Sequence, residues 1–163
     1  MPARPRQISV IGSGACEDSS ELWKLAEETG GHLAAAGAVV VCGGGGGVMG
    51  AVARGAAARG GTVIGIVPSE SPHDGDAHCT HVVATGIGHA RNLAVVASGE
   101  AVIAIGGEWG TLSEIGFARR LGRTVVALRS WNAVGEGAMA GAPGILEAES
   151  APEAVRLALE ALA

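Results

Sequence analysis

Short apolar runs alternate along this chain with longer segments whose apolar residues recur at helical spacing. None of the runs shows a regular polar alternation, which is typical of parallel strands buried on both faces. The predicted strands cover residues 7–12, 38–42, 62–68, 81–85, 101–107 and 124–128, and the predicted helices cover 18–37, 48–59, 88–99, 111–121 and 150–163. Strands that alternate with helices indicate an α/β fold: a Rossmann-like doubly wound, mostly parallel sheet with helices on both faces.

Capping signals suggest where the first helix begins and ends. Asp18 and Glu21 have the spacing of a capping box, and Gly37 suits the C-terminal cap. The pair Gly30–Gly31 argues against an uninterrupted helix, because glycine lowers helix stability by about 1 kcal/mol relative to alanine.

Composition narrows the class of protein. The chain has 163 residues, 48% of them hydrophobic and 17% charged, which predicts a single globular domain over residues 1–163. A net charge of -5 gives no broad attraction to nucleic acid or to an anionic membrane surface, and no apolar run is long enough to span a membrane. Cys16, Cys42 and Cys79 lack metal-type pairing and indicate reduced thiols in a cytoplasmic protein.

Three glycine-bearing turns follow predicted strands, at residues 12–14, 43–47 and 106–111. Ligands of doubly wound sheets bind at the carboxyl ends of the strands, and a helix N-terminus there offers free N–H groups to an anion. The five consecutive glycines at 43–47 are therefore a candidate phosphate loop at the start of the helix that begins at Val48. The alternative is that these glycines only permit close packing between strand and helix. The turns match neither a Walker A loop nor a dinucleotide fingerprint.

A polar loop at residues 73–81 contains three histidines, two aspartates and a cysteine. Its spacing does not match a closed zinc site, so we expect no metal there and interpret the loop as a polar lip over the ligand pocket. His32, in the first helix, is expected to face solvent.

Two segments of the chain resemble the signatures of the LOG-like family, whose members are often labelled lysine decarboxylases. They are "GGGGGVMGAVARGAAARGGTVIGIVP" and "GHARNLAVVASGEAVIAIGGEWGTLSEIGFARRLGRTVVAL", and the resemblance extends from Ile8 to Leu128. It is strongest to the short branch related to molybdenum cofactor carrier proteins. A better-known branch consists of phosphoribohydrolases that split nucleoside 5′-monophosphates into free base and ribose 5-phosphate. The resemblance implies a Rossmann-like fold and a homodimer.

The hydrolase branch places its catalytic arginine at Arg91 and its catalytic glutamate at Glu114. Three positions depart from its motifs: Asn92 stands for lysine, Gly106 for proline and Glu108 for glycine. A carboxylate at Glu108 would repel a phosphate if it pointed into the pocket. The resemblance therefore implies the pocket more firmly than the hydrolysis.

The chemistry of a hydrolase pair is coherent for these two side chains. Glu114 could stabilise positive charge that develops on the ribose, and Arg91 could hold the phosphate. The alternatives are that Glu114 completes a capping box with Thr111 and that Arg91 is a surface residue. Trp109 could stack on a base or pterin, or pack at a dimer contact.

Two functions remain open from the sequence: a phosphoribohydrolase that uses Arg91 and Glu114, and a carrier or sensor that binds a nucleotide or a molybdopterin-type ligand. No cofactor is required, and lysine decarboxylation is not expected because the single lysine, Lys24, lies in the first helix. The expected partners are a small phosphorylated ligand and a second copy, through the helices near 90–98 and 112–121. The candidate ligand-binding residues are Gly12, Ser13, Gly43, Gly44, Gly45, Gly46, Gly47, Met49, Asn92, Gly107, Trp109, Gly110 and Thr111.

Overall fold

A seven-stranded parallel sheet forms the centre of the computed structural model, which describes residues 3–130 and 142–163. The strand order is β4-β3-β2-β1-β5-β6-β7, and every neighbouring pair is parallel. The strands are β1 (Gln7–Gly12), β2 (Val39–Cys42), β3 (Val63–Val67), β4 (His81–Ala84), β5 (Ala101–Ile105), β6 (Val125–Leu128) and β7 (Ile145–Ala148). The predicted α/β doubly wound fold is confirmed.

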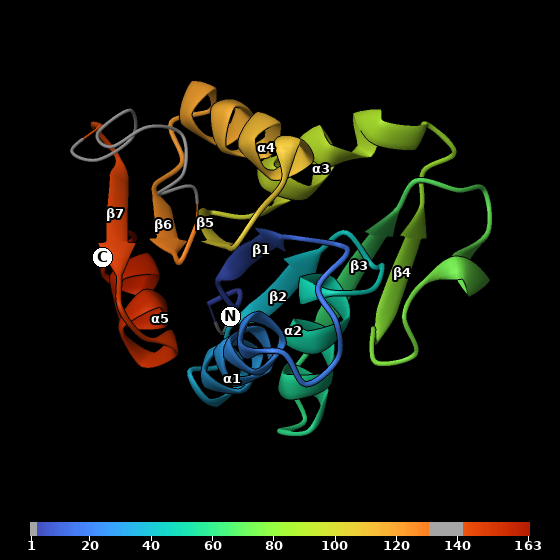
Figure 1. Cartoon of the computed structure of the whole chain (residues 1–163), viewed down its shortest axis with the longest axis horizontal. Helices are drawn as coiled ribbons and strands as arrows, with labels where there is room; N and C mark the ends of the chain where they lie inside the picture. The colour runs from blue at the N-terminus through green and yellow to red at the C-terminus, as the bar shows by residue number, and fades with distance from the viewer. Residues whose placement is uncertain (1–2, 131–141) are drawn as a thin grey trace.

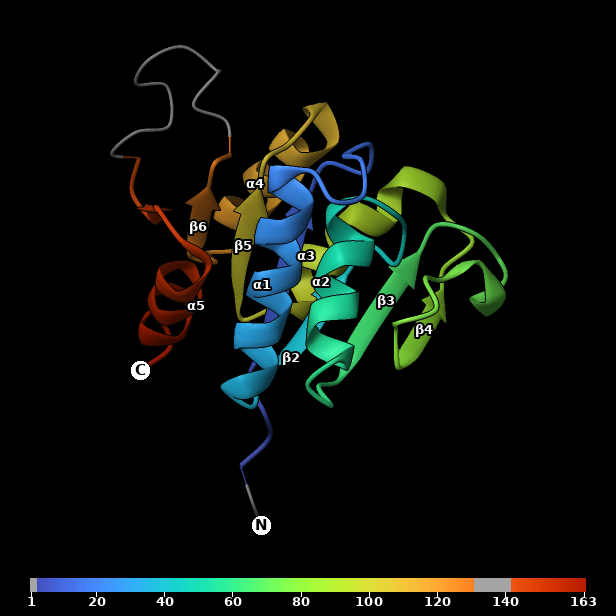
Figure 2. The same cartoon turned by 60° about the horizontal axis from the view of Figure 1, so that its bottom comes forward.

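Helices cover both faces of the sheet (Figures 1 and 2). α1, α2 and α5 pack on one face, and α3 and α4 pack on the other, so each face has its own apolar cluster. The helices are α1 (Glu21–Ala35), α2 (Val48–Ala57), α3 (Arg91–Ser98), α4 (Trp109–Arg120) and α5 (Ala151–Glu160), with short 3₁₀ turns η1 (Pro72–Asp74) and η2 (Gly88–Ala90). In the described ranges, no helix combines the length and the apolar character needed to cross a bilayer.

The strand order reverses between β1 and β5. The chain builds outward from β1 through β2, β3 and β4 on one side, and then returns to place β5 against the other edge of β1. Such a switch point leaves a crevice beyond the carboxyl ends of the two central strands, because the connections that follow them leave toward opposite faces.

Glycines allow α1 and α2 to pack closely on the same face. A Cβ on Gly30 would overlap the carbonyl oxygen of Val52, and one on Gly55 would overlap that of Glu27. Gly30 and Gly31 thus lie within an unbroken helix, contrary to the expected weakening, because contact with α2 compensates for their low helix propensity.

Two predicted helix starts were wrong, and one strand was not predicted. The N-cap of α1 is Ser20, whose hydroxyl accepts from the Trp23 N–H at 3.2 Å, and not Asp18. α4 begins at Trp109, two residues before the expected start. β7 was not predicted, because it is a short edge strand in which Leu146 and Glu147 are exposed and the apolar pattern is weak.

Candidate functional site

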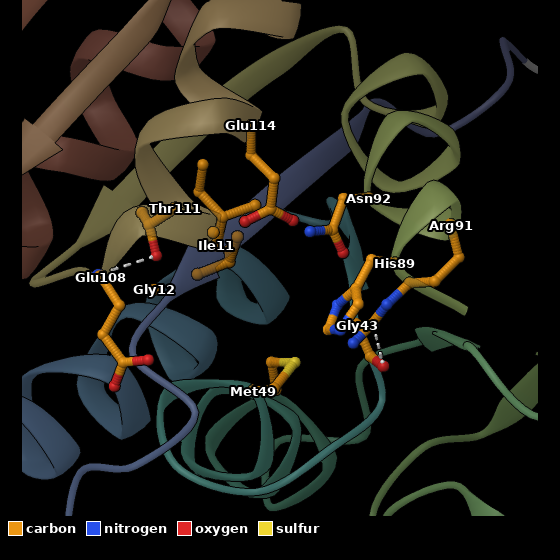
Figure 3. Close-up of a pocket in the computed structure, with 12 residues that line it drawn as sticks. Ile11, Gly12, Gly43, Met49, His89, Arg91, Asn92, Glu108, Thr111 and Glu114 are labelled. Carbon is orange, nitrogen blue, oxygen red and sulfur yellow. Dashed lines mark hydrogen bonds between the residues drawn. The ribbon is translucent and has the colours of Figure 1, made fainter.

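A cleft opens at the switch point, beyond the carboxyl ends of β1 and β5 (Figure 3). The start of α2 forms one side of it, and the first residues of α3 and α4 form the other. Twelve residues line the cleft: Val10, Ile11, Gly12, Gly43, Met49, His89, Arg91, Asn92, Glu108, Gly110, Thr111 and Glu114.

The glycine run connects β2 to α2. At three of its positions the backbone conformation or the neighbouring atoms require glycine. Gly44 and Gly47 have φ angles of 71° and 60°, which side-chain-bearing residues rarely adopt. A Cβ on Gly43 would overlap the guanidinium of Arg91. The alternative that these glycines permit close packing therefore applies to Gly43, Gly44 and Gly47.

Packing does not explain the other two glycines. A Cβ on Gly46 would meet no atom within 4 Å, and one on Gly45 would meet only the side chain of Met49, with Cε at 3.0 Å. Within the described residues, the N–H groups of Gly45 and Gly46 donate to no backbone carbonyl. Both positions offer free donors, and Gly46 also has open space beside it, as an anion-binding loop requires.

The N-terminus of α2 lacks a side-chain cap. Its N-cap residue is Gly47, and the Val48 N–H donates to the carbonyl oxygen of Ser13 at 2.9 Å. No acidic residue lies in the first turn. The positive end of this helix dipole is therefore not neutralised by the helix's own side chains.

The N-terminus of α4 is capped by a carboxylate. Glu108 is the N-cap residue: its side chain accepts from the N3 backbone N–H, and the Thr111 hydroxyl accepts from the Glu108 N–H at 3.4 Å. The Ser13 hydroxyl donates to Glu108 Oε1 at 2.8 Å, which joins the turn after β1 to the turn after β5. The second helix N-terminus at this cleft thus already holds a negative charge.

Arg91 is the first residue of α3 and extends across the carboxyl ends of the strands beside β1. Its Nη1 donates to the carbonyl oxygens of Gly43 and Ile66, at 2.9 Å for Ile66. Its Nε is buried and has no hydrogen-bond partner among the described residues. Burial lowers the pKa of the guanidinium, and the charge of Glu114 opposes that shift. Arg91 is therefore fixed by backbone carbonyls and is not the free surface residue of the alternative interpretation.

Glu114 lies in the second turn of α4, on the side of the cleft that α3 and α4 form. Its side chain is 9% exposed, and its carboxyl group points toward the amide of Asn92 (Figure 3). Desolvation raises the pKa of this carboxyl to about 7, and the charge of Arg91 opposes the rise. Because α4 begins at Trp109, Thr111 is the third residue of the helix and forms the capping box with Glu108. The predicted Thr111–Glu114 capping box was wrong.

The structure brings eight of the predicted site residues into one cleft. They are Gly12, Gly43, Met49, Arg91, Asn92, Gly110, Thr111 and Glu114. Ser13 lies at its edge through the bond to Glu108. The remaining predicted residues are not among the described residues that line the cleft: Gly44, Gly45, Gly46, Gly47, Gly107 and Trp109. The Trp109 side chain is 78% exposed.

Four residues of the cleft were not predicted from the sequence: Val10, Ile11, His89 and Glu108. Val10 and Ile11 belong to a buried strand, and only the strand order shows that β1 ends at the switch point. Glu108 was noted only as a departure from a motif. Its position at a helix N-terminus was the available signal, because acidic residues cap helices at that position.

A second cleft lies on the other side of the glycine run. Its lining includes Gly46, Gly47, Arg54, Asp76 and His78. Asp76 Oδ1 is 3.0 Å from His78 Nδ1, and the described residues include no group of three or more metal-ligating side chains. The polar loop therefore borders this second cleft. It was expected to form a lip over the main cleft, but none of its residues is among the described residues that line that cleft.

Comparison with known proteins gives concordant matches. The model of the SLOG cluster4 family matches residues 5–155. An uncharacterised protein of Archaeoglobus fulgidus is 42% identical over 123 residues, 76% of this chain and 80% of that protein. The structure of a molybdenum cofactor binding protein from Rippkaea orientalis matches with a TM-score of 0.88 and 30% identity, over 98% of this chain and 99% of that one. The molybdenum cofactor carrier protein of Chlamydomonas reinhardtii matches with a TM-score of 0.86 and 26% identity, over the same shares.

Proposed function

Because this chain belongs to the SLOG cluster4 family, a LOG-like family, we propose that it uses the cleft between β1 and β5 to bind a phosphate-bearing ligand without converting it. The ligand class that fits is a nucleotide or a pterin phosphate, and the molybdenum cofactor, carried as cargo, is the leading member of that class.

One observation carries this proposal: the two helix ends at the cleft differ in charge. The N-terminus of α2 is uncapped and follows the free amides of Gly45 and Gly46. The N-terminus of α4 is capped by the Glu108 carboxylate. A phosphate therefore gains binding energy at the glycine run and is repelled at α4.

The structural neighbours support the carrier assignment. Both proteins described above are named for the molybdenum cofactor that they bind or carry, and both match almost the whole chain. The carboxyl groups of Glu108 and Glu114 on the far wall are suited to accept hydrogen bonds from the ring N–H and amino groups of a pterin or purine.

Direct binding tests the proposal. The wild-type chain is titrated with molybdopterin, AMP and inorganic phosphate, and affinity is measured by calorimetry. We expect at least one phosphate-bearing ligand to bind, with Gly45→Val weakening it at least tenfold because the new side chain extends toward Met49 in the cleft.

Gly116→Val is the matched control. Gly116 lies in α4 outside the cleft lining, and its Cβ would meet no atom within 4 Å, so the substituted chain should fold and bind as the wild type does. Equal affinity of the Gly45→Val and wild-type chains, or no binding of any of the three probes, would overturn the proposal.

A second function is favoured by one observation, the buried Glu114 carboxyl with its pKa raised to about 7. A group that titrates near neutrality inside a cleft can exchange a proton or stabilise positive charge on a ribose. With Arg91 in the same cleft, this arrangement would suit hydrolysis of a nucleoside 5′-monophosphate to free base and ribose 5-phosphate.

Base release distinguishes the two functions. The chain is incubated with AMP, GMP and CMP, and free base is measured by chromatography. If hydrolysis occurs, Glu114→Gln should lower turnover by roughly 10²-fold or more while AMP still binds. Absence of free base in the wild type excludes the hydrolase and leaves the carrier.

A further inference from the structure

Two of the three cysteines lie together beneath the glycine run. Cys42 is the last residue of β2 and is fully buried, whereas Cys79 lies in the loop before β4 and is half-buried. The two thiols perturb each other's titration, and the Cys42 thiol donates to the carbonyl oxygen of Met49 at 3.9 Å. Cys79 packs against the same apolar cluster that contains Cys42, so both side chains lie on the α1–α2 face of the sheet.

A glycine on the neighbouring strand makes room for this pair. Gly65 of β3 is in register with Cys42, and the Sγ of Cys79 lies 2.7 Å from where a Cβ on Gly65 would be. Any side chain at position 65 would displace the Cys79 thiol. The sheet therefore holds the second sulfur directly beside the end of β2.

The two thiols differ in reactivity. Interaction with the Cys42 thiol lowers the pKa of Cys79, while the Cys79 thiol and burial raise the pKa of Cys42. The partly exposed Cys79 is therefore the thiolate that an external reagent meets first, and Cys42 is the adjacent thiol that can resolve the product. Burial raises the pKa of Cys16, which has no cysteine beside it in the described structure.

We propose that Cys42 and Cys79 form a dithiol modification site that reacts with small-molecule disulfides of the oxidised glutathione class to give an intramolecular disulfide.

The reaction proceeds in two exchanges. The Cys79 thiolate attacks one sulfur of the small disulfide, whose S–S bond breaks and releases one small thiolate. Cys42 then attacks Cys79 Sγ, the mixed S–S bond breaks and the second small thiolate leaves. The protons lost by Cys42 and Cys79 end on the two released thiols, so two protein thiols are oxidised and one small disulfide is reduced.

The new bond would link the polar loop to the candidate ligand loop. The Asp76 N–H already donates to the Gly44 carbonyl oxygen at 2.8 Å, and Cys42 directly precedes Gly43, whose carbonyl accepts from Arg91. The inference concerns the thiols alone and does not depend on what the cleft binds.

Trypsin separates the three cysteines, because Cys16, Cys42 and Cys79 fall in peptides 7–24, 25–54 and 60–91. The reduced full-length chain is incubated with oxidised glutathione, alkylated, digested and mapped by mass spectrometry. We expect titratable thiols to fall from three to one per chain, with peptides 25–54 and 60–91 linked and Cys16 alkylated.

Two variants and one unfolded sample complete the test. Cys79→Ser should prevent the linkage, whereas Cys16→Ser should leave it unchanged. If Cys79→Ser does not fold, the wild type in denaturant serves instead, since unfolding should produce mixed pairings that the native chain does not. A glutathione adduct that persists on Cys79 without linkage, or native linkage through peptide 7–24, would overturn the proposal.

Discussion

Glu114 lies in an environment that disfavours its charged form. Its carboxyl group is 9% exposed, faces a cleft and shares that cleft with a single nearby arginine. The cost of burying its charge exceeds the attraction of Arg91, so the neutral acid persists to about pH 7. A buried group that is held in an unfavourable state commonly marks a functional site.

This environment predicts a pH-dependent stability. The folded pKa of about 7 lies above the ordinary value of 4.5, so the folded state binds the proton more tightly than the unfolded state. Stability should therefore be fully present below about pH 4.5 and should fall as pH rises toward 7. The unfolding free energy of Glu114→Gln relative to that of the wild type should increase by about 1–3 kcal/mol as the pH rises through this range, measured by urea unfolding at pH 4.5 and pH 8. A stability difference that is the same at both pH values would contradict it.

Glu108 is predicted to set the anion selectivity of the cleft. Glu108→Gln keeps the size of the side chain but removes the negative charge from the N-terminus of α4. The affinity for inorganic phosphate should then rise by roughly three- to tenfold at low salt, and the gain should shrink as salt is added. Glu147→Gln, on the exposed edge strand β7, is the matched control and should change nothing.

At the scale of elements, the contact between α1 and α2 shows how sequence and packing can oppose each other. Glycine is a poor helix former, yet Gly30 and Gly55 bring the two helix backbones together on the face that carries the glycine run. Strands β1 to β6, by contrast, were predictable from sequence because their apolar runs have no competing signal, whereas the weak apolar pattern of β7 concealed it. Helix starts were harder, since several polar residues near each start could cap it and only the backbone path decides among them.

Gly55→Ala is predicted to destabilise the chain, because its Cβ would overlap the Glu27 carbonyl oxygen and force the helices apart. The expected loss of unfolding free energy is about 2 kcal/mol or more, the scale of overpacking. Gly116→Ala in α4 is the control: a Cβ there meets no atom within 4 Å, so it should be neutral or stabilising by up to about 1 kcal/mol. Equal effects of the two changes in chemical denaturation would refute the packing argument.

At the scale of the whole molecule, the strand order decides what sequence alone could not. The sequence predicted the strand–helix alternation and the glycine turns, so Gly12, Gly43 and Arg91 could be proposed as neighbours. The order β2-β1-β5-β6 is a property of long-range pairing, and it alone places Ile11 and Glu108 at the same crevice. The difference between the two helix starts, a carboxylate cap on α4 and no side-chain cap on α2, likewise emerged only once Glu108 was seen to cap α4.

The assembly is predicted to be a homodimer through α3 and α4. Leu93, Phe117 and Leu121 on these helices expose 38–43% of their surface, which a second copy could cover. Phe117→Asp should shift the mass in light scattering from dimer to monomer at micromolar concentration. Leu146→Asp, an equally exposed apolar residue on β7, should leave the dimer intact. A monomeric wild type would contradict the prediction.

The most direct test of the ligand site is an NMR titration of the ¹⁵N-labelled chain with the tightest phosphate-bearing ligand found by calorimetry. The glycine run at 43–47 and the first turn of α2 should hold the phosphate, so the amide signals of Gly45 and Gly46 should shift most and saturate with the calorimetric affinity. The amides at the Glu108-capped start of α4 should move less. Binding that leaves the Gly45 and Gly46 amides unmoved, while signals elsewhere shift, would contradict the assignment of the glycine run as the anion site.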